Sequence, residues 1–572
     1  MPTIEVNRAD LELLLGERID EERLLALLPL VKGEIKEWDE RDLKIELNDS
    51  NRPDLWSPEG IARQIRIHSN GGLQKEFYSF YTQNAIQKIT VSKTVTAIRP
   101  YLGGFLVRGL TISENVLAQL IQSQEKLADI FGQKRKTVSI GLYPLQKIAF
   151  PVRYETANPD TTAFIPLGTD QKMCLSEILK THPKGIAFAG LLKGHDHYPI
   201  LIDANDQILS FPPIINSRGT GEVKIGDTDL LVEVTGTHLR MVMLAVNMLA
   251  CNLFDRGGVI EPLDIVFPEA TDFGTVVKMP YSDETKPFSK KIEVELARFS
   301  EGLGEAISLE NAARFLVAYG YDVVTKEKSV TVQMPPYRDD LMHAVDVVED
   351  FAISRGYETF IPTLPATATI GSISSSSKQS ARWVSAMMGL GFEEVISNLL
   401  SSREEQEDFM NGPFPDNRPE GRLILIENPM TERYAVPRSA ILPSLLRVEG
   451  KSSKAYYPHR LFEVGEVARL TPSKKSCETV LHLAGIISHA EARFSELHAI
   501  LFAFFYDLRL AVAVKAISHP TFIEGRTGAI FTEKDGATVE IGIIGEVHPE
   551  VLTRWEIGVP TVGFEIEMKV GL

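Results

Sequence analysis

The chain has 572 residues, enough for about three to five domains of ordinary size. Its 44% hydrophobic and 24% charged residues are typical of a globular protein, but a net charge of −17 argues against a chain that grips DNA or another phosphate backbone by itself. Three separated cysteines without metal-ligand spacing indicate reduced thiols in the cytoplasm, and the longest apolar run, Met241–Phe254, is too short to cross a membrane.

The first 90 residues predict a small α/β module. Apolar residues recur at helical spacing over 10–15 and 21–30. Ser57 suits a helix N-cap and Pro58 suits the first helical position, so a helix is expected to run through about Ser69.

Residues 91–275 alternate short apolar runs with longer helical patterns, which indicates an α/β domain. The expected strands are Val91–Ile98, Gly103–Leu110 and Leu230–Val234, and the expected helices are Glu114–Ile130 and Leu239–Phe254.

Two further regions follow. Residues 276–362 predict a smaller, helix-rich lobe with a short hairpin, and residues 363–572 predict an antiparallel sheet flanked by helices. The run Gly371–Ser380 reads as a linker or an exposed loop, and Glu394–Leu399 and Leu423–Ile426 are among the strands expected after it. The fold class is therefore α+β, with several domains.

Acidic side chains gather on one face of a predicted helix within Pro335–Tyr357, PPYRDDLMHAVDVVEDFAISRGY. A helix that begins near Leu341 places three carboxylates within a ~100° arc, and a fourth joins from the entry turn. The four are Asp340, Asp346, Glu349 and Asp350. Clustered carboxylates raise one another's pKa unless a cation lies among them, and Mg²⁺ prefers oxygen ligands of this kind. A solvated acidic helix face and an arginine from a partner chain are the alternatives.

This segment resembles the B5 domain of phenylalanine–tRNA ligase beta subunits, with its P-x-x-R-x-D run and its terminal Gly-Tyr. The resemblance implies that the same four carboxylates hold Mg²⁺ at or near the contact with an alpha subunit. Asp350 stands where bacterial relatives often have Glu. Further blocks resemble the family in order along the chain: NDSNRPDLWSPEGIAR, ILSFPPIINS, NPMTERYAVPRSAILPSLL and GIIGEVHPEVL. The chain is most similar to the short archaeal and eukaryotic-type subunit, without the two extra terminal domains of the longer bacterial form.

The resemblance also implies a domain plan. It comprises an N-terminal α/β module (1–90), a B3/B4 editing-type domain (91–275), a B5 domain (276–362) and a class II synthetase-like module (363–572). The implied assembly is a cytoplasmic α2β2 tetramer that binds tRNA(Phe), and its alpha subunit attaches phenylalanine with ATP and Mg²⁺.

The last module looks like a degenerate copy of the class II catalytic fold. Catalysis in that fold needs arginines that hold the phosphates of ATP. The expected strand Leu461–Gly465 carries none, although Arg460 precedes it, and Val562–Glu567 carries glutamates instead. This chain is therefore not expected to be the ATP-using one.

The family's B3/B4 domain carries a second, hydrolytic site. By resemblance to archaeal relatives, its residues here are Leu201, Ser210, Glu233 and Thr235. A pocket shaped for phenylalanine cannot strongly reject tyrosine, so Tyr-tRNA(Phe) is the expected substrate. Glu233 or Ser210 is expected to meet the tyrosine hydroxyl, and Thr235 to orient the attacking water. Glu233 departs from the family, which tends to have Asp there.

Other interpretations of these residues stay open. The helix expected after Thr235 offers free N–H groups to an ester or an oxyanion, but Thr235 or Thr237 also suits a plain N-cap. Ser210 also suits a turn. A structural scaffold for the alpha subunit without active editing, and a free-standing editing hydrolase, are the alternative functions.

Overall fold

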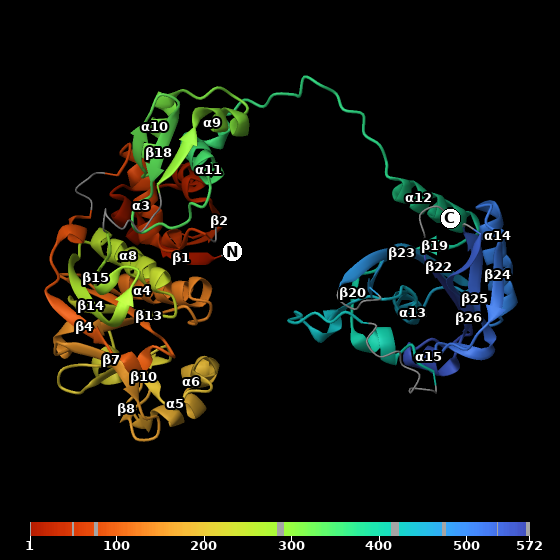
Figure 1. The fold of residues 1–572 in the computed structure, drawn as a ribbon, viewed down its shortest axis with the longest axis horizontal. Helices are drawn as coiled ribbons and strands as arrows, with labels where there is room; N and C mark the ends of the chain where they lie inside the picture. Colours follow the sequence, from red (N-terminus) through yellow and green to blue (C-terminus); the bar gives the residue numbers. More distant parts are fainter. Residues whose placement is uncertain are drawn as a thin grey trace. The chain divides into compact units, whose positions relative to one another are not determined.

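The computed structural model describes residues 2–39, 41–48, 51–73, 78–282, 291–412, 423–452, 454–471, 476–534 and 536–567. The chain divides into two compact units, Met1–Leu364 and Pro365–Leu572 (Figure 1). Both units mix helices with mostly antiparallel sheets, which confirms the predicted fold class. Among the described helices, none has the length and hydropathy that a membrane crossing requires.

The N-terminal part of the first unit packs helices against a three-stranded antiparallel sheet in the order β1-β3-β2. Its elements are β1 (Thr3–Asn7), α1 (Arg8–Leu15), α2 (Glu21–Leu27), β2 (Gly33–Trp38), β3 (Asp42–Leu47) and α3 (Pro58–Ser69). The prediction for α3 is confirmed, since Ser57 Oγ accepts a hydrogen bond from the Gly60 amide and Pro58 opens the helix.

A ten-stranded sheet forms the middle of the first unit. Along its main path the strands are β12 (Ile215–Asn216), β11 (Ile208–Phe211), β10 (Tyr198–Ile202), β7 (Val152–Ala157), β4 (Gln87–Val91), β14 (Val259–Thr271), β5 (Tyr101–Arg108), β13 (Leu230–Gly236) and β6 (Val138–Pro144), and β15 (Gly274–Met279) pairs with β14. The expected strand Val91–Ile98 is wrong beyond Val91, because Ser92 caps a short 3₁₀ turn at Lys93–Val95.

The apolar run Met241–Phe254 lies within α8 (Leu239–Asp255), a mostly buried helix that packs against β5 and β13. Other helices of this region are α4 (Glu114–Lys126), α5 (Leu175–Thr181), α6 (Pro183–Phe188) and α7 (Arg218–Gly221). Because β13 lies between β5 and β6, its backbone is paired along both edges.

A helix-rich lobe closes the first unit, as expected. It contains β16 (Ile292–Glu295), α9 (Leu296–Leu303), α10 (Leu309–Ala318), β17 (Asp322–Thr325), β18 (Ser329–Gln333) and α11 (Ala344–Arg355). The hairpin β17–β18 gains a third strand, β16. Helix α11 begins at Ala344 rather than near Leu341, because Asp346 accepts hydrogen bonds from the amides of Met342 and His343 and so caps the helix there.

The second unit is built on a seven-stranded sheet in the order β19-β22-β23-β27-β26-β25-β24. The strands are β19 (Glu393–Glu394), β22 (His459–Leu470), β23 (Cys477–Ser488), β24 (Val512–Ala516), β25 (Phe522–Lys534), β26 (Ala537–Val547) and β27 (Thr561–Glu567). Alternate residues of β23 enter two cores: Leu483 and Ile487 on one face, Ala484 and Ile486 on the other.

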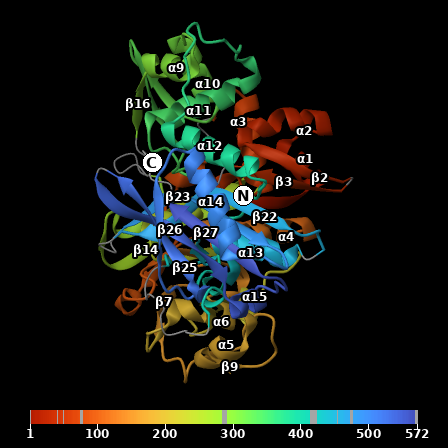
Figure 2. The ribbon, with the colours of Figure 1, turned by 90° about the vertical axis from the view of Figure 1, so that its right-hand side faces the viewer.

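Helices cover both faces of this sheet. The first core includes residues of α12 (Ser375–Gly389) and α14 (Phe494–Asp507), and α14 lies across the strands (Figure 2). The second core includes residues of α13 (Leu442–Lys451) and α15 (Pro549–Arg554).

Three predictions in this unit need correction. The expected linker Gly371–Ser380 becomes helical at Ser375, because the Ser374 side chain caps α12. Leu423–Ile426 is not a strand: it pairs with no other strand of the described residues, and Leu425 and Ile426 are exposed. Of the expected strand Glu394–Leu399, only Glu394 lies in a strand, as the second residue of β19.

Candidate functional site

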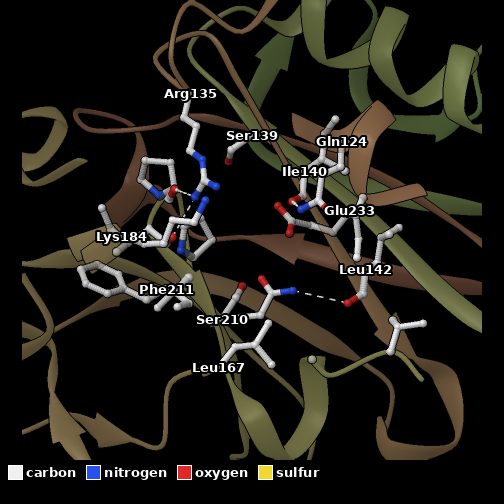
Figure 3. A pocket seen from close by; sticks show the side chains of 18 of the residues that line it. Gln124, Arg135, Ser139, Ile140, Leu142, Leu167, Lys184, Ser210, Phe211 and Glu233 are labelled. Atoms are coloured by element: carbon white, nitrogen blue, oxygen red, sulfur yellow. Dashed lines mark hydrogen bonds between the residues drawn. The ribbon is translucent and has the colours of Figure 1, made fainter. Parts of the chain in front are cut away.

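A cavity of about 270 Å³ opens beside the ten-stranded sheet. Its walls come from α4, β6, β13 and the Ser210–Asn216 segment. Figure 3 shows Ser139, Ser210 and Glu233 around this space, with Arg135 and Lys184 on one side of it. The wall thus combines apolar surface with a few polar groups, as ligand sites usually do.

Strand pairing sets the position of Glu233. In β13 it lies opposite Gly104 of β5 and Gly141 of β6. A Cβ atom at Gly141 would come within 2.3 Å of Tyr143 Oη and 2.5 Å of Glu233 Oε2. The absence of a side chain at Gly141 therefore makes the space in which the Tyr143 and Glu233 side chains meet.

Glu233 is a buried carboxyl with an unusual pKa. Its side chain is 3% exposed, and Oε2 accepts a hydrogen bond from Tyr143 Oη at 2.9 Å. Burial raises the pKa of Glu233 to about 7, against the opposing effects of the Tyr143 hydrogen bond, the Arg99 charge and the Thr235 hydroxyl. Near neutral pH the Glu233 carboxyl is thus partly protonated and partly ionised, so it can either donate a proton or accept a hydrogen bond.

Thr235 lies in the same strand but behind the cavity wall. It is fully buried, and its Oγ1 lies 2.9 Å from both Arg99 Nε and Ser139 Oγ. Arg99 also donates to Ser139 Oγ and to the Arg135 carbonyl, so it ties Thr235 to two residues of the cavity wall. Burial lowers the pKa of Arg99 to about 10, which still leaves it charged at neutral pH.

Leu201 also stays away from the cavity surface. It is fully buried in β10, where it pairs with Ser210 of β11 and Tyr154 of β7. Of the four predicted editing residues, Ser210 and Glu233 therefore line the cavity, while Leu201 and Thr235 support its walls.

The start of α8 does not serve the cavity as expected. Thr235 and Thr237 are not N-caps, because β13 continues through Gly236 and the N-cap is His238. Residues of the first turn of α8 are absent from the cavity lining. The N–H groups at the start of this helix thus do not line the cavity.

The polar residues of the site that were not predicted from the sequence include Arg99, Ser139 and Tyr143. The segment Val138–Pro144 was not predicted as a strand, although Val138, Ile140 and Leu142 alternate with other side chains. Recognising that strand would have drawn attention to Tyr143, since a buried tyrosine needs a partner for its hydroxyl.

The four carboxylates of the acidic helix do not come together as one ligand set. Arg338 donates to Asp340 through Nε and Nη2, at 3.0 and 2.6 Å, and to Asp350 through Nη2 at 2.7 Å. Burial alone would raise the pKa of Asp340, but the Arg338 charge holds it below its ordinary value. The cation among these carboxylates is therefore the chain's own guanidinium.

The other two carboxylates have separate tasks. Asp346 caps α11, and Glu349 pairs with Lys32 at 2.8 Å in an exposed position. Across the described residues, no group of three or more His, Cys, Asp or Glu side chains is arranged to hold a metal ion. The predicted magnesium site at Asp340, Asp346, Glu349 and Asp350 does not fit this arrangement, because α11 starts later and Arg338 neutralises two of the four.

In the second unit, Glu565 of β27 binds the backbone amides at the start of α13. Its carboxylate accepts hydrogen bonds from the amides of Ile441 and Leu442, at 2.9 to 3.0 Å, and lies 2.7 Å from His482 Nδ1. Arg438, also buried, pairs with Glu463 of β22 at 2.6 Å. Arg460 pairs with Glu496 at 3.2 Å. Arg438 and Arg460 are thus each paired with a carboxylate of the same unit.

Comparisons with known proteins agree over the whole length. A family model for the "Phenylalanyl tRNA synthetase beta chain CLM domain" matches residues 361–568, and one for the "tRNA synthetase B5 domain" matches residues 292–357. Phenylalanine–tRNA ligase beta subunits of Borrelia hermsii and Borrelia turicatae are 38% and 37% identical, with 99% of each chain covered. A crystal structure of an N-terminal fragment of the phenylalanyl-tRNA synthetase beta subunit from Pyrococcus horikoshii matches with a TM-score of 0.58 and 36% identity, over 62% of this chain and 100% of the fragment. The chain belongs to the family of phenylalanine–tRNA ligase beta subunits.

Proposed function

We propose that this chain works with an alpha subunit in the attachment of phenylalanine to tRNA(Phe), as the part of the ligase that does not use ATP. The observation that carries this proposal is its identity of 38% with a beta subunit over 99% of both chains. The position of Glu565 supports the second half, because β27 carries this carboxylate where, by the resemblance, class II catalysis would need an arginine. ATP and Mg²⁺ then act in the cytoplasmic complex at the alpha subunit, in a tetramer of two alpha and two beta chains.

We also propose that the chain is of the short archaeal and eukaryotic type, shared by some bacteria. The near-complete coverage of the Borrelia relatives and the 36% identity with the archaeal fragment support this assignment.

The four-part division at about residues 90, 275 and 362 is part of the same proposal. The separate sheets of the first unit and the unit limit at Leu364 support it.

The second activity that we propose is hydrolysis of Tyr-tRNA(Phe) at the cavity beside Glu233. A volume of about 270 Å³ lies at the small end of ligand sites, which run from roughly 300 to 1,000 Å³. It suits an aminoacyl group better than a nucleotide. Ser210 and Glu233 offer polar atoms to a phenol hydroxyl, while Leu201 and Thr235 hold the walls.

Discrimination follows from burial. A tyrosyl ester can satisfy a buried polar group with its hydroxyl, whereas a phenylalanyl ester leaves that group without a partner, which costs about 1–3 kcal/mol. Glu233 is such a group, because its Oε1 is buried and has no hydrogen-bond partner in the described part of the chain. The cavity therefore favours the mischarged ester over the correct one.

Two measurements test these proposals. Co-expression with the cognate alpha chain should give a stable complex that charges tRNA(Phe), whereas this chain alone should not. In that complex, Glu233→Ala combined with Thr235→Ala should leave Phe charging intact and reduce Tyr-tRNA(Phe) hydrolysis. Unchanged hydrolysis in the double variant would remove Glu233 and Thr235 from the mechanism. Absence of hydrolysis by the wild-type complex would support a scaffold without active editing, and full hydrolysis by the chain alone would support a free-standing hydrolase.

A further inference from the structure

The hydroxyl of Tyr143 connects the two polar walls of the cavity. Tyr143 belongs to β6 and is fully buried, and its Oη lies 2.9 Å from both Ser210 Oγ and Glu233 Oε2. Asn216 Oδ1 lies farther away, at 3.4 Å. One phenol thus bridges β11 and β13, on opposite sides of the same site.

A phenol has one proton, so Tyr143 donates to only one neighbour at a time. Burial and the Glu233 charge raise the pKa of Tyr143 well above its ordinary value, so it remains protonated. When Glu233 is ionised, its carboxylate is a stronger acceptor than the Ser210 hydroxyl, so the O–H of Tyr143 donates its hydrogen bond to Glu233. Ser210 then donates to the phenol oxygen.

The hydrogen bond from Tyr143 occupies one oxygen of the Glu233 carboxylate but not the other. Oε2 is held by Tyr143, whereas Oε1 is buried without a hydrogen-bond partner among the described residues. A buried carboxylate oxygen without a donor is costly, and a ligand hydroxyl would remove that cost. Tyr143 therefore holds the carboxylate by one oxygen, while the other oxygen keeps its capacity to accept a hydrogen bond.

We propose that Tyr143 is a positioning residue of this cavity, which holds Glu233 so that Oε1 accepts a hydrogen bond from the phenol hydroxyl of a bound tyrosyl ester. The inference rests on the proposed editing function and assigns the selectivity to a pair, Tyr143 and Glu233. Gly141 belongs to the same arrangement, since any Cβ there would displace both side chains. Tyr143 itself need not touch the ester.

The test uses the complex with the alpha subunit and the variant Tyr143→Phe, which removes only the hydroxyl. Affinities for non-hydrolysable 3′-tyrosylamino and 3′-phenylalanylamino adenosine are measured together with Tyr-tRNA(Phe) hydrolysis from pH 6 to 9. The preference for tyrosyl over phenylalanyl analogue should fall roughly 10-fold, since a hydrogen bond to a charged group is lost or misdirected. The midpoint of the pH profile should rise, because the Tyr143 hydrogen bond lowers the pKa of Glu233.

Tyr319→Phe is the matched control. Tyr319 is also buried, but its hydroxyl donates to the Leu30 carbonyl at 3.0 Å, away from the cavity lining. Neither the preference nor the pH midpoint should change in this variant. Gly141→Ala should lose the preference as Tyr143→Phe does, with the Tyr143 hydroxyl still present.

The outcomes separate the two proposals. If the wild-type complex prefers the tyrosyl analogue and hydrolyses Tyr-tRNA(Phe), but Tyr143→Phe keeps the same preference and pH midpoint, the role of Tyr143 is overturned and the editing function stands. If the wild-type complex shows neither preference nor hydrolysis, both are overturned. A reduced preference in Tyr143→Phe with a raised midpoint supports the inference.

Discussion

Arg338 and Asp350 form a buried ion pair, with Arg338 Nη2 2.7 Å from Asp350 Oδ2. The same guanidinium binds Asp340, and Asp340 Oδ1 lies 3.9 Å from Arg52 Nε. Arg52 in turn pairs with Asp54. The NRPDL block and the PPYRDD block, which lie far apart in the sequence, thus share one network of alternating charges inside the first unit.

This network predicts that the region is stable without metal. Replacing Arg338 by Met leaves Asp340 and Asp350 buried without their counter-ion, and breaking a buried pair in this way costs about 3–5 kcal/mol. Hydrogen exchange of the α11 amides in Arg338→Met should therefore be much faster than in the wild type. The same measurement on the wild type should be unaffected by EDTA.

Arg240→Met is the control for this experiment. Arg240 pairs with Asp339, beside the network, but is 44% exposed, so the loss should stay below about 1 kcal/mol. Faster exchange of α11 in wild-type protein after chelation would contradict the assignment and restore a role for a bound cation.

Sequence alone located the carboxylates of this network but not their counter-ion. The spacing of Asp340, Asp346 and Glu349 correctly indicated a carboxylate-rich segment at α11. Helical periodicity, however, does not reveal where a helix begins, and Asp346 is used to cap it. The counter-ion, Arg338, stood inside the recognised motif, but sequence cannot show that its side chain turns back onto Asp340 and Asp350.

Arg99 leads to a second prediction, about the editing cavity. Its Nε and Nη2 bind both oxygens of Thr235, the hydroxyl at 2.9 Å and the carbonyl at 2.6 Å. Lysine keeps the charge but cannot make this two-point contact, so Arg99→Lys leaves a buried acceptor unsatisfied, at a cost of about 1–3 kcal/mol. Tyr-tRNA(Phe) hydrolysis by the complex should fall while Phe charging stays unchanged.

Arg153→Lys provides the comparison, because Arg153 is a partly exposed arginine of β7 that pairs with Asp206. Hydrolysis should be the same in this variant as in the wild type. If Arg99→Lys also retained full hydrolysis, the position of Thr235 would not matter to the reaction.

A third prediction concerns pH. The pKa of Glu233 is raised from 4.5 to about 7, so the folded state binds the proton more tightly than the unfolded state does. The stabilising effect is complete below about pH 4.5 and is lost as the pH rises to about 7, which amounts to about 3 kcal/mol. Glu233→Gln removes the titration, so its β13 amides should be better protected than those of the wild type at pH 8 and similar at pH 4.5.

Hydrogen exchange of both proteins at matched pH measures this difference directly. Equal protection at pH 8 would mean that the buried carboxylate carries no such cost.

The pair Glu233 and Tyr143 also marks the limit of sequence reasoning at this site. Ser210 and Glu233 were predicted from the resemblance and do line the cavity, but Tyr143 joins them only through the pairing of β6 with β13.

The last prediction concerns Glu565, in the second unit. Glu565 accepts hydrogen bonds from the amides of Ile441 and Leu442, all in buried surroundings, and so satisfies N–H groups at the start of α13. Glu565→Ala leaves these donors unsatisfied and should destabilise the second unit by about 1–3 kcal/mol. Glu567→Ala, on the same strand, removes a partly exposed pair with Arg469 and should cost less than about 1 kcal/mol. Exchange of the α13 amides in the full chain measures both, and equal effects of the two variants would show that the Glu565 carboxylate does not hold the helix.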